Sequence, residues 1–250
     1  MSARGTLVRI LTSRGLRGLA DGLVSVLLAD HLTRIELPPW QVGAVVTATL
    51  LGSAALTLLL GAFVHRLDRR LVLLAACALM AGTGIGFATL SAFVPLLLVA
   101  LVGTLNPSTG DVSIFLPTEQ SVLADGARAA RRTWVFAWYN VLGSLAGAVG
   151  SAAAAIPERL ARAEVATIDL LQRAAFGFYA LTGALIAMVY AGLPPMPPVA
   201  ASAAPLAKSR RTVFVLAALF SLDSLGGGFV VQSMVALWLC FALRKVDTVA

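Results

Sequence analysis

Residues 51–82 read LGSAALTLLLGAFVHRLDRRLVLLAACALMAG, two apolar runs separated by the charged segment HRLDRR at residues 65–70. A helix of about 20 apolar residues is long enough to cross a lipid bilayer. Clustered arginines stay in the water at one face of the membrane. The stretch therefore predicts two membrane-spanning helices, over residues 41–64 and 71–93, joined by a loop at one membrane face.

The composition of the whole chain supports the same fold class. Of the 250 residues, 59% are hydrophobic and only 12% are charged, whereas a soluble domain has about 25% charged residues. We therefore expect an all-α polytopic membrane protein whose surroundings are the lipid bilayer. Apolar runs predict seven spans, at residues 14–33, 41–64, 71–93, 95–123, 133–156, 174–193 and 213–242.

The basic residues predict the orientation of these spans. With 19 Lys and Arg against 12 Asp and Glu the net charge is +7. Nucleic-acid-binding domains expose such charge on a soluble surface, but here it lies between apolar runs, so we expect no nucleic-acid partner. A cytoplasmic N-terminus places 13 of the 19 basic residues in cytoplasmic segments, as the positive-inside rule requires. We expect an integral protein of a plasma membrane or bacterial-type inner membrane.

Cofactor chemistry and processing leave little signal in the sequence. Cys77 and Cys240 both lie inside apolar runs, and two cysteines supply neither a disulfide framework nor a site with four metal ligands. We expect no metal and no cofactor. The first apolar run lacks a small-residue cleavage signature, so we expect no removable signal peptide.

Acidic side chains inside predicted spans are the main candidates for function. Asp21 lies in the first span, Asp111 and Glu119 in the fourth, and Asp223 in the seventh. A charged side chain near the middle of a bilayer costs about 2.5–3.5 kcal/mol on insertion scales, so such residues face protein or water and not lipid. We interpret these acids as sites for a proton or for a polar part of a solute.

The fourth span has the most polar sequence of the seven. It contains NPSTGD at residues 106–111, and Pro107 and Pro117 are expected to kink its helix. Freed carbonyl groups at this depth are tolerated where they line a cavity, so Asn106 joins the candidates. Asp111 and Glu119 are eight residues apart, about 80° around a helix, and are expected to border one cavity shared with the first span.

Two structural alternatives remain open for these acids. Asp21 can pair with Arg17, four residues earlier on the same helix. Glu119 can lie in water at the cytoplasmic mouth. In the fifth span, the spacing of Gly143, Gly147 and Gly150 predicts close helix contact.

An interfacial aromatic belt is the simplest interpretation of three further residues. Trp134, Trp138 and Tyr139 lie near the start of the fifth span. Trp and Tyr are enriched where a span meets the membrane surface. We therefore expect all three rings at that surface.

The loop between the second and third spans resembles the loop signature of the major facilitator superfamily. That signature has a Gly, three variable residues, an acid, Arg, one variable residue, Gly and two basic residues. The segment departs from it at His65 and Asp68. The matching positions are Gly61, Arg66, Arg69 and Arg70.

The resemblance implies the N-terminal six-helix half of such a bundle plus one further transmembrane helix. Domains would be residues 1–193 for the six-helix bundle, 194–212 for a cytoplasmic linker, and 213–250 for the first helix of a second half. Asp223 follows Asp21 by 202 residues in a similar apolar context, which agrees with duplication of a six-helix unit. In this family the first, fourth and seventh spans line the central cavity.

A secondary active transporter, and not an enzyme, is the function that the resemblance implies. It would move a small solute by alternating access, coupled to protons. One alternative is a non-transporting membrane fragment or scaffold. A weaker one is an intramembrane aspartyl protease, suggested by Gly110-Asp111, although the Gly-x-Gly-Asp and Tyr-Asp signatures of that family are absent.

Reporter fusions test the predicted orientation. A reporter joined after Gly126 should be cytoplasmic, because the arginines that follow it are retained on that side. A matched fusion after Glu164, in the loop predicted to lie outside, should report the opposite side. If the reporter after Gly126 lies outside and the reporter after Glu164 lies inside, the predicted topology is reversed.

Overall fold

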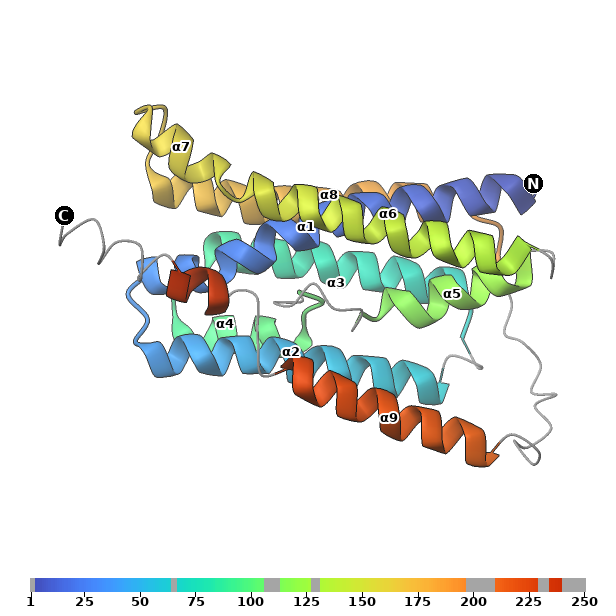
Figure 1. The fold of residues 1–250 in the computed structure, drawn as a ribbon. Coiled ribbons are helices and arrows are strands. Elements are labelled where there is room, and N and C mark those ends of the chain that lie inside the picture. Colours follow the sequence, from blue (N-terminus) through green and yellow to red (C-terminus); the bar gives the residue numbers. More distant parts are fainter. Residues whose placement is uncertain are drawn as a thin grey trace.

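The computed structural model is a bundle of long helices (Figure 1). It describes residues 3–63, 67–105, 113–126, 131–196, 210–228 and 234–239, and none of these residues forms a strand. The helices are α1 (Ala3–Arg34), α2 (Pro39–Phe63), α3 (Arg69–Thr89), α4 (Phe93–Val102), α5 (Phe115–Gly126), α6 (Arg132–Ala153), α7 (Ile156–Arg162), α8 (Ile168–Ala191) and α9 (Arg210–Gly228).

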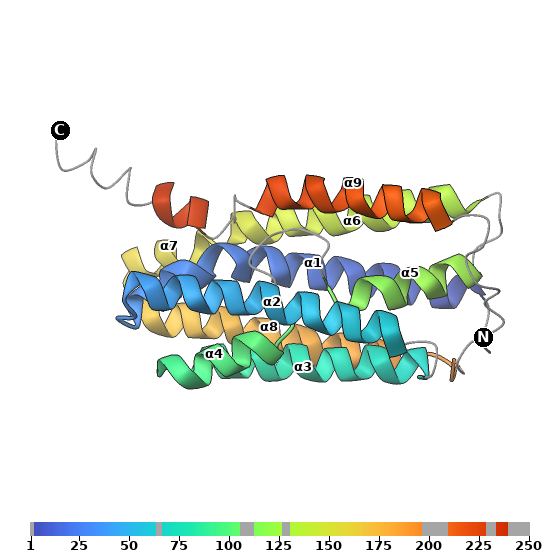
Figure 2. The same ribbon diagram turned by 90° about the horizontal axis from the view of Figure 1, so that it is seen from below.

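Helix α1 runs through the bundle and packs against α6 and α8. Helix α3 packs along α8, and α2 packs along α4. The core between them contains fully buried apolar side chains, among them Leu28, Leu73 and Phe176. In both ribbon views α9 lies at the outside of the bundle (Figures 1 and 2).

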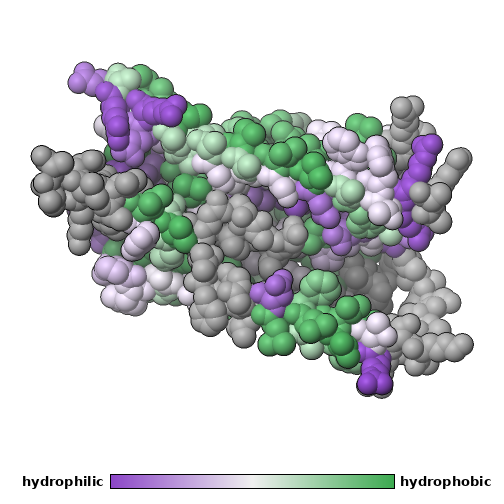
Figure 3. All heavy atoms as spheres, viewed as in Figure 1, coloured by the Kyte–Doolittle hydropathy of each residue, from purple (hydrophilic) through white to green (hydrophobic). Residues whose placement is uncertain are grey.

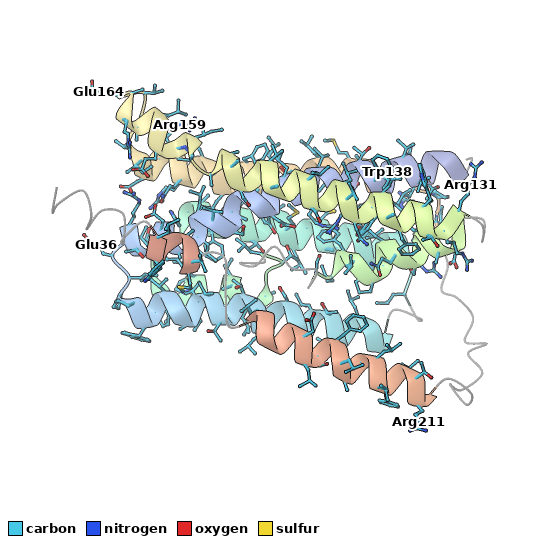
Figure 4. All side chains as sticks on the ribbon, viewed as in Figure 1. Glu36, Arg131, Trp138, Arg159, Glu164 and Arg211 are labelled. Carbon is cyan, nitrogen blue, oxygen red and sulfur yellow. The ribbon has the colours of Figure 1, made fainter. Side chains whose placement is uncertain are left out.

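The outward faces of the helices are apolar. On α6, Trp134, Val141, Leu145 and Val149 are all at least 46% exposed, and their spacing places them on one helix face. In Figure 3 apolar surface runs along the molecule between hydrophilic groups near the two ends. Figure 4 likewise places Glu36, Arg159 and Glu164 at one end and Arg131 at the other. This pattern fits a bundle surrounded by lipid.

Four helical segments in the described part of the chain are long and apolar enough to cross a membrane. They are Pro39–Gly61, Arg69–Thr89, Arg132–Arg162 and Ile168–Ala191, and they match the second, third, fifth and sixth predicted spans. The first predicted span lies within α1, which has 32 residues. The N-terminal orientation stays a prediction.

The fourth predicted span is not one kinked helix, so that expectation is wrong. Helix α4 ends at Val102, where Gly103 takes an extended conformation with ψ 173°. The backbone N–H of Thr104 donates instead to the Thr83 hydroxyl oxygen at 3.3 Å. Helix α5 begins at Phe115, and Pro117 lies in its first turn, where helical N–H groups need no partner in the helix.

The seventh predicted span, residues 213–242, corresponds to α9 and to the short helical segment 234–239. The side chains of residues 211–223 are all exposed. Helix α9 is thus hardly packed against the rest of the described bundle. The division into domains at residues 193 and 212 stays a prediction.

Close contact between α1 and α6 depends on glycines, which confirms the packing predicted for the fifth span. A Cβ atom on Gly22 would lie 2.1 Å from the carbonyl oxygen of Gly147. A Cβ on Gly150 would lie 2.0 Å from the carbonyl oxygen of Leu19. Both distances are too short for a real contact, so any larger residue forces the two backbones apart.

Alanine substitutions test this contact. Gly22→Ala should destabilise the protein by about 1–3 kcal/mol, since overpacking at a tight contact moves the backbone. Gly177→Ala on α8 is the matched control, because a Cβ there meets nothing within 4 Å. Thermal unfolding in detergent should show a lower Tm for Gly22→Ala alone. Equal midpoints for the two variants would contradict the tight contact.

Candidate functional site

A salt bridge is buried between α1 and α5. Arg17 is 1% exposed and Glu119 is 0% exposed. Their contact is bidentate: Nη1 of Arg17 donates to Oε1 of Glu119 at 2.6 Å, and Nη2 donates to Oε2 at 2.8 Å. Such a forked pair fixes the geometry of both side chains.

Two tyrosine hydroxyls complete the hydrogen bonding of this carboxylate. Tyr139 on α6 donates to Oε2 of Glu119, and Tyr190 on α8 donates to Oε1. A carboxylate has about four acceptor positions, so those of Glu119 are filled. The guanidinium of Arg17 also lies over the ring of Phe115, 4.4 Å from its centroid. The cluster is therefore an ionised carboxylate held by four helices.

Apolar side chains surround this cluster. Ile10, Val122, Leu123 and Val135 form a buried group together with Tyr139. Charges placed in such surroundings lose their hydration, and only a close, fully bonded partner offsets that loss. The arrangement is thus stable as a pair, and either charge alone would be strongly unfavourable.

Asp21 lies one helical turn from Arg17 along α1 and is partly exposed. Its carboxylate interacts with the hydroxyl of Tyr179 on α8. That hydroxyl lies 3.4 Å from the side-chain oxygen of Thr104, next to the end of α4. Asp21 is thus held less completely than Glu119 and is the more available of the two acids.

The structure brings two of the five candidate residues together. Glu119 is paired with Arg17, and Asp21 interacts electrostatically with the same arginine. Asp223 lies on α9 with an exposed side chain, away from this cluster. Asn106 and Asp111 lie outside the described residues.

The structure decides both alternatives left open for these acids. Glu119 is not in water at a mouth of the bundle, because it is fully buried. The terminal nitrogens of Arg17 donate to Glu119, so Arg17 is not committed to Asp21. Helices α1 and α5 are in direct contact through this pair, so the described residues leave no open cavity between the two side chains.

The tyrosines were missed or misassigned from the sequence. Trp134 and Trp138 are 59% and 50% exposed, as expected for an interfacial belt, but Tyr139 is 0% exposed. The chain has three tyrosines, and all three point to the acids of this cluster: Tyr139, Tyr179 and Tyr190. Their rarity, together with Arg17 inside an apolar span, was the available signal.

The residues of the loop motif tie helices together at the end of the bundle that holds the N-terminus. Nη1 of Arg69 pairs with Oδ2 of Asp125 at 2.6 Å, and Nη2 of Arg70 donates to the Ala191 carbonyl at 2.7 Å. Asp68 caps α3 by accepting from the N–H of Arg70 at 2.8 Å. Gly61 is exposed at the end of α2. Arg66 lies outside the described residues.

Metal binding finds no support in the part of the chain that the structure describes. No group of three or more His, Cys, Asp or Glu side chains there lies close enough to hold a metal ion. The polar groups of the site are instead engaged in charge pairing and hydrogen bonding with one another.

Comparison with known proteins supports membrane location but no family. No known family model matches the chain. The chain is 28% identical over 156 residues to a yeast protein, "Uncharacterized membrane protein YJR124C" of Saccharomyces cerevisiae. The match covers 62% of this chain and 35% of the yeast protein, so the chain spans about a third of that relative's length. Together with the apolar helices, it identifies a helical membrane protein.

Substitution of one member of the buried pair should be far more damaging than substitution of both. Glu119→Ala leaves Arg17 buried and unpaired and should cost about 3–5 kcal/mol of stability. Combining Arg17→Met with Glu119→Leu should recover part of this loss. Thermal unfolding and yield in detergent measure both effects.

The control is Glu158→Ala on α7. It breaks the exposed pair between Glu158 and Arg162, whose side chains are 48% and 78% exposed. Exposed pairs contribute about 0–1 kcal/mol, so its unfolding midpoint should stay close to that of the unaltered protein. A similar loss for Glu119→Ala and Glu158→Ala would show that the buried pair is dispensable.

Proposed function

We propose that this chain forms the first six-helix half of a secondary active transporter of the major facilitator type, followed by one further transmembrane helix. In the whole protein it would move a small solute by alternating access, coupled to protons. The observation that carries the proposal is the buried charge cluster of Arg17, Glu119 and Asp21 inside an apolar bundle. Ionisable residues in a membrane are costly, and they mark ion or solute pathways.

The packing of the helices gives independent support. Taking α4 and α5 as one broken span, the spans in order are α1, α2, α3, α4 with α5, α6, and α8. In an inverted repeat, the first span corresponds to the fourth, the second to the fifth, and the third to the sixth. Under this correspondence the α1–α6 contact matches the α2–α4 contact, and the α1–α8 contact matches the contacts of α3 with α4 and α5. The α1–α2 contact likewise matches the α5–α6 contact. Inverted repeats of three spans are the known construction of such halves.

The loop motif adds a third argument. Arg69 and Arg70 link the start of α3 to the end of α5 and the end of α8. These contacts support a role for the motif in holding one end of the bundle closed. The resemblance of the motif to the family signature and its contacts thus favour the same architecture.

The geometry also indicates how a proton would act. Arg17 binds Glu119, whose acceptor positions are filled, and it also interacts electrostatically with Asp21. Asp21 is the acid with room for a proton or a cationic solute group. Protonation of Asp21 removes a negative charge one helical turn from Arg17. A difference in proton affinity between two conformations would then link protonation to a change of access.

Isosteric amides test this function in vesicles that contain the protein at its full natural length and an entrapped pH-sensitive dye. A panel of solutes is added under an imposed pH gradient, and solute-dependent proton flux is recorded. Asp21→Asn and Asp111→Asn should abolish gradient-driven accumulation and retain exchange of solute, because the amide mimics a protonated acid.

Asp169→Asn is the control, since Asp169 is an exposed carboxylate in the first turn of α8. It should leave both accumulation and exchange unchanged. Unchanged accumulation in the Asp21 and Asp111 variants at several pH values would show that these acids are structural. Absence of any solute-dependent flux in the unaltered protein would favour a non-transporting membrane scaffold.

A further inference from the structure

A second buried polar cluster lies toward the other end of α1. His31 is 2% exposed and Gln172 on α8 is 1% exposed. His31 follows Arg17 by 14 residues, about 21 Å along the helix. This cluster is therefore separate from the site described above, and sequence reasoning did not find it.

Both ring nitrogens of His31 have polar neighbours. Nδ1 lies 3.3 Å from Oε1 of Gln172, and Nε2 lies 3.2 Å from the carbonyl oxygen of Phe87 on α3. The ring also packs against Phe176, with centroids 4.8 Å apart. The imidazole is thus fixed between three helices.

The orientation of the Gln172 amide follows from Asp30. Nε2 of Gln172 donates to Oδ2 of Asp30 at 2.5 Å, and Nε of Arg34 donates to the same oxygen at 2.8 Å. An ionised carboxylate only accepts hydrogen bonds, so reversal of the amide would place two acceptors together. The amide oxygen of Gln172 therefore faces His31.

His31 consequently lies between two acceptors, because a backbone carbonyl also cannot donate. A neutral imidazole has one N–H and can satisfy only one of them, whereas the imidazolium donates from both nitrogens. The Phe87 carbonyl belongs to the last turn of α3, beyond Gly86, whose carbonyl accepts from the N–H of Leu90. The last carbonyls of a helix lack partners within it. That helix end favours cations, and Arg173 occupies it as well through the Ala88 carbonyl at 3.3 Å.

Other groups around the ring act in opposite directions. Burial disfavours the charged ring, and so do the nearby cations Arg173 on α8 and Arg34 on α1. The carboxylates of Asp30 on α1 and Asp169 on α8 favour it. From α3, the group that contacts the ring nitrogens is the Phe87 carbonyl.

We propose that His31 is a proton-binding site at which the bound proton completes a hydrogen-bonded chain from Arg34 through Asp30 and Gln172 to the C-terminal end of α3. The proton joins α1, α3 and α8 at this end of the bundle. The site goes beyond the proposed transport function and does not depend on it, since it follows from donors and acceptors alone.

Nitrogen NMR of labelled histidine tests the proposal directly. The chain has two histidines, His31 and His65, so His65→Gln leaves one signal set in the full chain, reconstituted in lipid nanodiscs. On acidification to about pH 5, both nitrogens of His31 should reach imidazolium shifts, with both N–H groups slow to exchange with water. A ring that stays neutral at this pH, or whose N–H groups exchange freely, overturns the proposal.

Two variants distinguish the effect of the hydrogen-bonded chain on proton binding by His31 from the effect of nearby charges. Gln172→Leu removes one acceptor and should weaken proton binding about tenfold, a shift of about one pH unit in the midpoint. Asp169→Asn removes an exposed carboxylate that lies outside the chain of hydrogen bonds and should change the midpoint much less. An unchanged midpoint in Gln172→Leu, or an equal shift in Asp169→Asn, contradicts the proposed chain. If Gln172→Leu does not fold, the NMR spectrum of His31 in the protein with Gln172 intact still tests the proposal.

Discussion

The ion pair between Arg17 and Glu119 constrains how the helices of this bundle can be arranged. Both charges lie in apolar surroundings, where an unpaired charge would be several kcal/mol less stable than in water. Arg17 belongs to α1, Glu119 to α5, and the supporting hydroxyls of Tyr139 and Tyr190 to α6 and α8. A shift of α1 or α5 by one turn would separate the pair, and a shift of α6 or α8 would remove one of the hydroxyl donors. The register of four helices therefore follows from one carboxylate and its donors.

The tight packing of α1 against α6 makes this arrangement possible. Gly18 follows Arg17 directly, and a Cβ atom there would lie 2.7 Å from the carbonyl oxygen of Gly143. Gly143 is one turn after Tyr139 on α6. The closest approach of the two backbones thus occurs beside the residues that must meet, and larger side chains at these glycines would move the Tyr139 hydroxyl away from the carboxylate.

Apolar run length was enough to predict most helices, because a span is a local property of the chain. The presence of Glu119 inside a span could be read in the same way, since a charge within an apolar run is visible locally. Its partner could not, because Arg17 is 102 residues away in sequence. The break after α4 could not be predicted either, because it depends on a hydrogen bond to Thr83 of another helix. The burial of Tyr139 was missed because Tyr139 and the exposed Trp138 both lie near the same end of a span.

Polar contacts at the middle and near the C-terminal end of α1 also limit which parts of the bundle can move separately. At the middle, Tyr190 of α8 reaches the carboxylate bound by Arg17, and near the C-terminal end, Gln172 of α8 bonds with Asp30. Because each contact is buried or partly buried, sliding of α1 past α8 would break both at once. Helices α2 and α4 pack on each other largely through apolar side chains, which can rearrange without leaving a charge unpaired. We infer that α1, α6 and α8 move as one rigid unit.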